Sequence, residues 1–346
     1  MSAIQAARNY VAWAFRRATV QAIEVQRNAY YRVRETPQGR ALLKTAEFLR
    51  APSSNRTRRR TAHDYVARAQ PPVMDPAKGY AFTSVEKFEK FDTVLAAARD
   101  LFQRKKAAID AEREGFDSWD EERRQKYLKR KDNFLRNLLD DADLREKPTL
   151  VDFALSDSVL GMATRYLGTV PYLCRVDLVY SLPRAAADNI SSQLFHVDPE
   201  GLTQVKFFIH VFDVGEAEGP FTFIPADEST RILAEIRKLR RRQGKPNIGR
   251  YQDEEIAAVG GDGSIVRLKA PAGGGVAIDT SRCLHMGSRV QPGASRLCLY
   301  LQYCTTLEPT NVFDVDRLKP DPVRHLAVKH STEPNANRVG PSAQMA

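Results

Sequence analysis

The sequence predicts an α+β protein in which a β-sandwich or barrel is flanked by helices and preceded by a basic helical arm. Three observations lead to this prediction. Apolar residues recur at helical spacing through residues 1–50 and again through 80–168. Short runs rich in Val, Tyr and Phe, separated by Gly and Pro turns, fill residues 172–303. Positive charge is concentrated at one end of the chain.

The net charge of the chain belongs to its first part. The 346 residues hold 53 Lys and Arg against 43 Asp and Glu, a net of +10. Residues 1–70 contain 14 basic and 4 acidic residues, so the remainder contains 39 of each and is neutral. No apolar run approaches the roughly 20 residues that span a bilayer, and no secretory hydrophobic region opens the chain. We therefore expect a cytoplasmic protein.

The chain is predicted to divide into three parts. Residues 1–75 form the basic helical arm and a linker, because residues 51–61 are polar and basic without any periodicity. Residues 76–330 form the main domain, with its flanking helices. Residues 331–346 are rich in Ser, Pro, Asn and Gly and are expected to be a disordered tail.

Two interpretations of the basic arm stay open. It is compatible with an amphipathic helix on an anionic membrane surface, which would make the protein peripheral to the membrane. It is equally compatible with a helix that packs on the main domain and contributes to a dimer. A nucleic-acid partner is not supported, because no nucleic-acid-binding motif accompanies the charge.

Helices are expected before the strands. The region from Phe88 to Leu139 carries apolar stripes at helical spacing, including a heavily charged stretch over 118–140. A further helix is predicted to run to Leu167, capped by Ser156 or Asp157, with Gly168 just past its end.

The strands are predicted after Pro171, with one helical insertion over about 227–243. The expected strands are Tyr172–Ser181, 205–212, 221–224, 265–268, 275–278 and 297–303.

A candidate metal site emerges from the histidines. His196 and Asp198 follow a strand-like run, and residues i and i+2 of a strand face the same side. His285, after the strand 276–279, is the best third ligand. Two His and one carboxylate form the facial triad of non-haem Fe(II) oxygenases, which leaves coordination positions open. Arg296, eleven residues after His285, suits a carboxylate, because its planar guanidinium binds one in a bidentate manner.

These residues, in this order, resemble the phytanoyl-CoA dioxygenase-like family of Fe(II)/2-oxoglutarate-dependent oxygenases. The family pattern is His-x-Asp, a long gap (86 residues here), a second His, and an Arg about ten residues later. The resemblance covers roughly residues 150–307. Further segments that look like the family's are 206–214, 218–225 and 277–288.

The resemblance implies a double-stranded β-helix, a jelly-roll or cupin-like barrel, as the fold. It implies a hydroxylase that uses Fe(II), 2-oxoglutarate and O2, acts on an unactivated C–H bond of a small or carrier-linked substrate, and releases succinate and CO2. His196, Asp198 and His285 would be the catalytic metal ligands, and Arg296 would hold the distal carboxylate of 2-oxoglutarate. Gln193, Lys206 and Thr280 are polar candidates for the same pocket.

Two alternatives stay open. A cupin-like isomerase or lyase would use the metal without 2-oxoglutarate, and Arg296 argues against it. A catalytically silent barrel would serve only for binding, and the intact triad argues against that. The substrate is expected to be a small molecule. The basic cluster Arg237–Arg242, which lies between the metal ligands in the sequence, is either a solvated helix face or an attractant for an anionic substrate.

Overall fold

The computed structural model divides into two compact units, Met1–Asn55 and Arg56–Ala346, which are treated separately. The first 36 residues of the predicted arm and the predicted tail 331–346 lie outside the described residues. The structure describes residues 37–84, 86, 88, 91–128, 133–184, 189–198, 202–245, 249–287, 289–305 and 321–328.

The smaller unit contains helix α2 (Pro37–Arg50) and the first residues of helix α3 (Pro52–Ala69). Between the two helices the Asn55 side-chain amide donates to the Phe48 carbonyl (3.1 Å). Two large apolar side chains of α2, Leu42 and Leu49, are exposed.

Residues 51–61 were expected to lack regular structure but are helical, although the division between the two units, after Asn55, falls within them. They belong almost entirely to α3, whose later residues Arg58, Ala62 and Tyr65 are buried in the larger unit. Arg58 donates to the carbonyls of Val170 (2.6 Å) and Leu326 (2.5 Å). Both hydrogen bonds join residues far apart in the sequence, so the local composition of residues 51–61 does not predict them.

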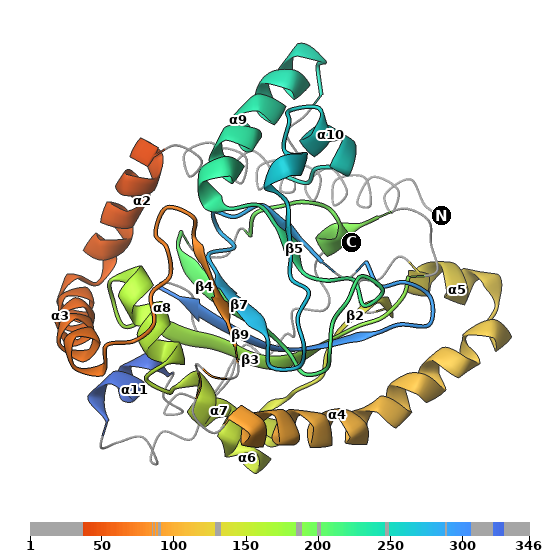
Figure 1. Ribbon diagram of the computed structural model, residues 1–346, viewed down its shortest axis with the longest axis horizontal. Helices are drawn as coiled ribbons and strands as arrows, with labels where there is room; N and C mark the ends of the chain where they lie inside the picture. Colours follow the sequence, from red (N-terminus) through yellow and green to blue (C-terminus); the bar gives the residue numbers. More distant parts are fainter. Residues whose placement is uncertain are drawn as a thin grey trace, which may run out of the picture. The chain divides into compact units, whose positions relative to one another are not determined.

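The larger unit is built on two antiparallel sheets, shown near the centre of Figure 1. The six-stranded sheet has the order β1-β7-β4-β9-β3-β2, and the three-stranded sheet has the order β6-β5-β8. This confirms the predicted class at the level of mixed helices and antiparallel sheets. The strands of the larger sheet are β1 (Tyr80–Thr83), β2 (Leu135–Asn137), β3 (Tyr172–Ser181), β4 (Gln204–His210), β7 (Gly275–Ile278) and β9 (Arg296–Cys304). Those of the smaller sheet are β5 (Thr222–Phe223), β6 (Val266–Arg267) and β8 (His285–Met286).

Alternation along β4 and β9 separates the face of the larger sheet that lies in the main core from the face that carries the site residues. On β4, Phe207 and Ile209 lie in the main hydrophobic core, so Lys206, Phe208 and His210 point to the other face. On β9 the apolar positions 297, 299, 301 and 303 do the same. Arg296 and Tyr300 therefore share the other face with Lys206.

Helices cover the apolar face. Residues of α4, α7 and α8 form one hydrophobic core with the inward residues of β3, β4 and β9. A second cluster joins α9 and α10 to the smaller sheet through Phe195, Ile224 and Leu284. In Figure 1, α9 and α10 lie beyond β5, well away from α4 and α7. The helices are α4 (Phe91–Glu114), α5 (Glu121–Leu128), α6 (Asp141–Glu146), α7 (Pro148–Ala154), α8 (Val159–Leu167), α9 (Ala226–Arg242), α10 (Asp253–Ala257) and α11 (Pro322–Ala327).

Several predicted boundaries differ from the structure. Helix α8 ends at Leu167, and Gly168 adopts the expected left-handed conformation (φ 67°). The N-cap position of α8 is Ser158, which makes no side-chain cap hydrogen bond, while the predicted capping residue Ser156 accepts from the Val159 N–H through its hydroxyl (3.4 Å). The helical stripe expected through residue 140 was wrong at Leu135–Asn137, which forms β2 and pairs with β3. Pairing with a long neighbouring strand outweighs local periodicity there.

A membrane-spanning helix needs about 20 consecutive apolar residues. None of the described helices meets that need.

Candidate metal centre

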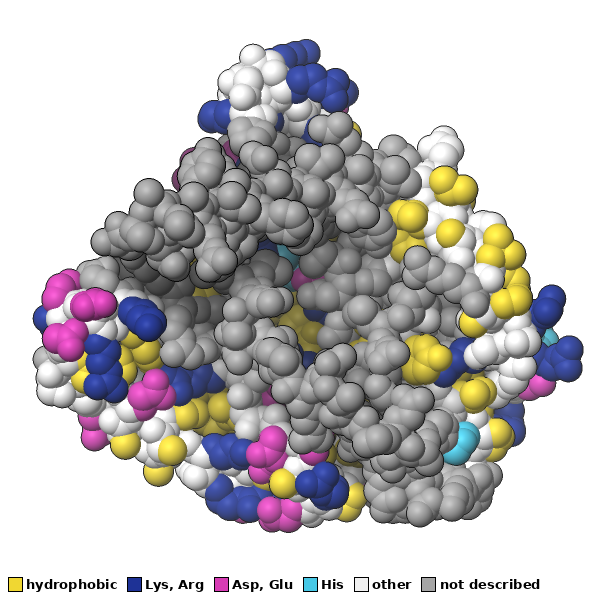
Figure 2. Space-filling model, turned by 180° about the vertical axis from the view of Figure 1, so that it is seen from behind, with side chains coloured by type: hydrophobic (Ala, Val, Ile, Leu, Met, Phe, Trp, Pro, Cys, Tyr) yellow, Lys and Arg dark blue, Asp and Glu magenta, His cyan; other side chains and the backbone are white. Residues whose placement is uncertain are grey.

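Three side chains with metal-binding atoms converge between the two sheets. His196, Asp198 and His285 are all buried, and one potential ligand atom of each lies within 4.8 Å of the other two. Asp198 Oδ1 lies 3.6 Å from His196 Nε2, and Asp198 Oδ2 lies 3.5 Å from His285 Nε2. Figure 2 shows the colours of His and of Asp or Glu close together near the middle of the face drawn.

Backbone pairing brings the two histidines together. His196 and His285 exchange backbone hydrogen bonds (3.0 and 2.9 Å) as a two-residue antiparallel bridge. Directly paired residues project to the same face of a sheet, and the two imidazole rings lie 4.3 Å apart. The 88 residues between the two histidines are therefore closed into a loop by one strand contact.

Both imidazoles are oriented by backbone carbonyls. His196 Nδ1 lies 2.8 Å from the Leu194 carbonyl, and His285 Nδ1 lies 3.0 Å from the Cys283 carbonyl. A carbonyl only accepts, so each Nδ1 carries a proton, and Nε2 is the ring nitrogen that faces Asp198. Burial, followed by the neighbouring His285, lowers the pKa of His196 well below its ordinary value, so this imidazole is neutral near pH 7.

Asp198 is ionised because Lys206 pairs with it. Burial alone would raise the pKa of the Asp198 carboxyl, but the Lys206 ammonium, followed by His285, holds it well below its usual range. Lys206 Nζ donates to Asp198 Oδ2 at 2.6 Å, and both side chains are buried. Lys206 therefore reaches the metal centre itself.

A buried aspartate fixes the turn before His285. Asp279 accepts from the backbone N–H and the hydroxyl of Ser281 (3.0 and 2.5 Å) and from the hydroxyl of Tyr166 (3.0 Å). The Thr280 carbonyl in this turn accepts from the backbone N–H of Asp198 (2.8 Å). The Thr280 hydroxyl is buried and has no hydrogen-bond partner among the described residues.

Arg296 is buried without an acidic partner among the described residues. Its guanidinium donates to two neutral oxygens, the Gly219 carbonyl and the Ser181 hydroxyl (3.3 Å), and no described residue offers an acceptor to its Nε. Burial lowers the pKa of Arg296, because no described carboxylate offsets the loss of solvent. A buried cation is costly unless a negatively charged group pairs with it.

The carbonyl that holds Arg296 depends on a glycine. Gly219 has φ +63°, and a Cβ there would lie 2.6 Å from the backbone of Arg289. Gly287 approaches the same guanidinium: a Cβ at 287 would lie 3.4 Å from Arg296 Nη2. The Gly219-Pro220 turn thus supports the arginine as well as the strands.

An aromatic wall stands next to the histidines. The Phe221 ring lies 5.6 Å from the His285 ring and stacks on Phe208 (4.2 Å). Phe208 in turn contacts Tyr300 (5.5 Å), and Lys206 Nζ lies 5.6 Å from the Tyr300 ring. Sequence reasoning missed Phe221 and Tyr300 as site residues; the alternation along β9 was the signal that places Tyr300.

Gln193 and His210 have structural partners. Gln193 lies in the short helical turn Ser191–Gln193, where its side-chain oxygen accepts from the Ile190 N–H (3.2 Å). Its contact with a co-substrate stays a prediction. His210 Nε2 donates to the Leu268 carbonyl (3.1 Å). Burial, followed by the charge of Arg296, lowers the pKa of His210 to about 4, so it is neutral near pH 7.

The basic cluster at the end of α9 contains one buried member. Arg240 forms a two-contact ion pair with Glu255 (2.6 and 2.8 Å) and lies over the Tyr251 ring (4.6 Å). Arg241 and Arg242 are exposed. The six residues therefore do not form one uniform basic surface.

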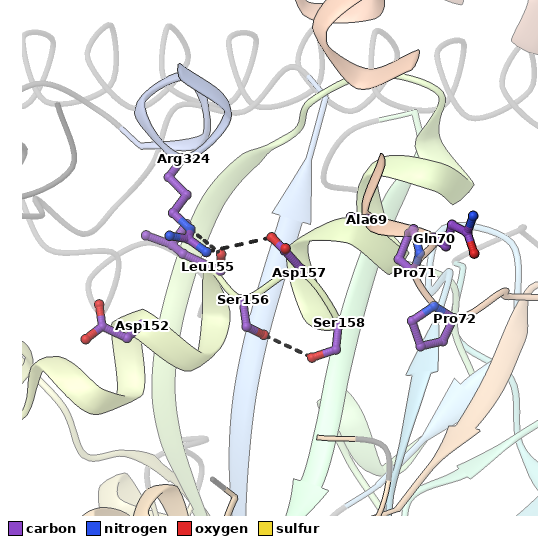
Figure 3. A pocket seen from close by; sticks show the side chains of 10 residues that line it. All are labelled: Ala69, Gln70, Pro71, Pro72, Asp152, Leu155, Ser156, Asp157, Ser158 and Arg324. Carbon is purple, nitrogen blue, oxygen red and sulfur yellow. Dashed lines mark hydrogen bonds and ion pairs between the residues drawn. The ribbon is translucent and has the colours of Figure 1, made fainter. Parts of the chain in front are cut away.

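A cavity of about 520 Å³ lies elsewhere in the larger unit, between the end of α3, the α7–α8 turn and α11 (Figure 3). Arg324 there pairs with Asp157 (3.7 Å), and Ser156 and Ser158 share a hydrogen bond (3.1 Å). None of the predicted site residues lines this cavity.

Comparisons with known proteins give only weak similarities. No protein-family model matches the chain. No curated protein matches it significantly.

Solved structures do match, at low identity. EctD from S. alaskensis is 15% identical, with a TM-score of 0.42 over 69% of this chain and 78% of that one. SnoK, a non-heme alpha ketoglutarate dependent carbocyclase, is 16% identical, with a TM-score of 0.39 over 70% and 87%. The epimerase SnoN, solved with Fe3+ and alpha ketoglutarate, is 14% identical, with a TM-score of 0.39 over 71% and 84%. Similarities this distant do not establish a function, so the interpretation below depends on the residues of this chain.

Proposed function

We propose that this chain is an Fe(II)/2-oxoglutarate-dependent oxygenase of the phytanoyl-CoA dioxygenase-like type, built on a double-stranded β-helix. It would hydroxylate an unactivated C–H bond of a small or carrier-linked organic substrate. The observation that supports this most strongly is the combination of a His-Asp-His cluster with a buried arginine that has no acidic partner among the described residues.

The residues fit a metal ion. His196 and His285 would each bind it through Nε2, since both Nδ1 atoms are committed to carbonyls, and Asp198 would supply the carboxylate. Two neutral imidazoles and one carboxylate suit Fe(II), and three protein ligands leave positions for other groups. Lys206 would keep the second oxygen of Asp198 engaged and so orient the carboxylate.

The residues also fit 2-oxoglutarate. Arg296 would bind its distal carboxylate, because a guanidinium with an unused Nε–H has the donors that a carboxylate accepts. The unpartnered Thr280 hydroxyl is a second donor in this region, and Gln193 and Lys206 remain candidate contacts. When bound, iron and 2-oxoglutarate would supply the oxidising chemistry, in which O2 is consumed, succinate and CO2 are released and one oxygen atom enters the substrate.

The chain's own contribution is placement and protection. The paired strands hold the histidines at fixed separation, and the carbonyl contacts hold their rings in one orientation. The wall formed by Phe208, Phe221 and Tyr300 limits water beside His285. A rigid, partly dry site of this kind suits an oxidation that must be confined to the bound substrate.

The proposal is tested by anaerobic loading with Fe(II) and 2-oxoglutarate, followed by O2 and detection of succinate, with a panel of candidate substrates. We expect bound iron in the full-length protein and succinate formation with it. His285→Ala and Asp198→Ala should each lower succinate formation more than about 100-fold and reduce bound iron, since direct ligands matter at least as much as outer-shell partners.

His63→Ala is the matched control, because the His63 side chain is 85% exposed and lies far along the chain from the metal centre. It should retain iron and succinate formation. Metal-dependent turnover without succinate would instead support the isomerase or lyase alternative, and iron binding without any turnover of the panel or of 2-oxoglutarate would support the silent barrel.

A further inference from the structure

A short strand contact extends the smaller sheet past the histidines. Phe195 and Tyr251 exchange backbone hydrogen bonds (3.0 and 2.9 Å), and the next residue, His196, does the same with His285 on its other side. In an antiparallel pair with 195 opposite 251, residue 250 lies opposite residue 196. Residues opposite one another project to the same face with Cβ atoms about 5 Å apart. The register therefore places Arg250 beside His196, on the face that carries the metal ligands.

The backbone around Arg250 is held firmly. Arg240 donates to the Arg250 carbonyl (2.7 Å) while it pairs with Glu255. Asp253 forms two contacts with Arg289 (2.6 and 2.8 Å), and Arg289 Nε donates to the Gln193 carbonyl (2.8 Å). The first arginine–carboxylate pair thus fastens the 249–257 segment to α9. The second fastens it to Arg289, which also holds the turn that precedes His196. A side chain on such a segment has a defined starting position.

The charge of Arg250 acts on the metal centre. Arg250 contributes to the lowered pKa of His196, behind burial and the effect of His285, which agrees with the register. Arg250 is half-buried, whereas Arg296 is 7% exposed. Arg296 lies near Gly287, two residues beyond His285, and Arg250 lies beyond His196 on the side away from His285. The two guanidinium groups approach the centre from different strands.

We propose that Arg250 is the specificity-determining residue for the primary substrate, and that this substrate carries a carboxylate or phosphate group. The inference rests on the proposed function, in which Arg296 binds the distal carboxylate of 2-oxoglutarate. A second guanidinium at the centre is then available for a charged group of the primary substrate. The basic cluster Arg237–Arg242 at the end of α9 was the sequence's candidate for attracting an anionic substrate. Arg250, beside the metal centre, takes that role instead. The planar, multidentate guanidinium suits both oxyanions.

The test uses calorimetric titration of the full-length protein, loaded anaerobically with Fe(II) and 2-oxoglutarate so that Arg296 is occupied. The probes are benzoate, phenyl phosphate and benzamide, which share one ring and differ in the attached group. We expect the better of the two anions to bind at least tenfold more tightly than benzamide, and which one it is distinguishes a carboxylate substrate from a phosphate ester. Arg250→Gln should weaken that anion at least tenfold and leave benzamide unchanged.

Two further variants separate charge at this position from charge in general. Arg250→Lys keeps the positive charge but loses the planar group that binds an oxyanion in a bidentate manner, so it should restore part of the affinity for the anion. Arg242→Gln removes an exposed charge and should leave the affinity for the anion unchanged. Equal binding of the anion to Arg250→Gln and the parent, or no preference for either anion over benzamide, would overturn the proposal. Succinate formation from 2-oxoglutarate without substrate is measured in parallel: its absence would count against the proposed function, while the titration still decides whether Arg250 binds anions.

Discussion

At the scale of single residues, the metal centre depends on what each polar side chain is paired with. The sequence indicates His196, Asp198 and His285 from residue type and spacing, and the structure brings these three together. The same reasoning placed Lys206 only as a pocket candidate. Its ion pair with Asp198 crosses from β4 to the loop after His196, and a single sequence does not supply that register.

The pair between Lys206 and Asp198 makes the metal-free centre sensitive to one substitution. Lys206→Met leaves a buried carboxylate without its main counter-charge, so the free energy of unfolding of the metal-free protein should fall by about 3 kcal/mol. Urea unfolding measures this. Lys238→Met is the control, because its pair with Glu235 is exposed and should matter by less than about 1 kcal/mol. A similar decrease in the free energy of unfolding in both variants would show that the buried ion pair stabilises the protein no more than the exposed one.

At the scale of elements, periodicity located most strands and the insertion helix, because both have long apolar patterns. β3 has the predicted bounds, and α9 differs from the predicted 227–243 by one residue at each end. The two-residue strands β5, β6 and β8 are shorter than predicted or were not predicted, since their pairing depends on partners rather than on a pattern. His285 lies on one of these short strands, β8, and its contacts with the other ligands depend on pairing across the chain, which a local pattern does not predict.

The ion pair between Arg240 of α9 and Glu255 of the 249–257 segment is expected to stabilise the fold. Arg240→Met should lower the free energy of unfolding by about 3 kcal/mol, because Glu255 loses its partner and the Arg250 carbonyl loses a donor. The amide of Tyr251 should also exchange faster with deuterium. Arg242→Met, an exposed neighbour on the same turn, should change stability by less than about 0.5 kcal/mol. If both variants behave alike, the ion pair does not fasten the segment.

At the scale of the whole molecule, distant segments are joined by a few long-range polar contacts that no local pattern reveals. The basic arm was predicted to extend to residue 75, whereas the structure divides the chain after Asn55. Residues of α3 such as Ala62 and Tyr65 belong to the main core. A run of arginines predicts solvent exposure, yet one member, Arg58, is buried. Only the positions of its partners, 112 and 268 residues away, distinguish it from Arg59 and Arg60.

Arg58 therefore tests whether α3 is an integral part of the larger unit. It donates to the carbonyls that precede β3 and end α11, and its guanidinium lies 3.7 Å from the centre of the Tyr172 ring. Arg58→Met removes both donors and the cation–π contact, so the free energy of unfolding should fall by about 3 kcal/mol in urea. Arg60→Met, on the exposed side of the same helix, should stay within about 0.5 kcal/mol of the parent. Equal stability of the two variants would mean that α3 is held to the larger unit by its buried apolar residues alone, and that the polar contacts of Arg58 add nothing.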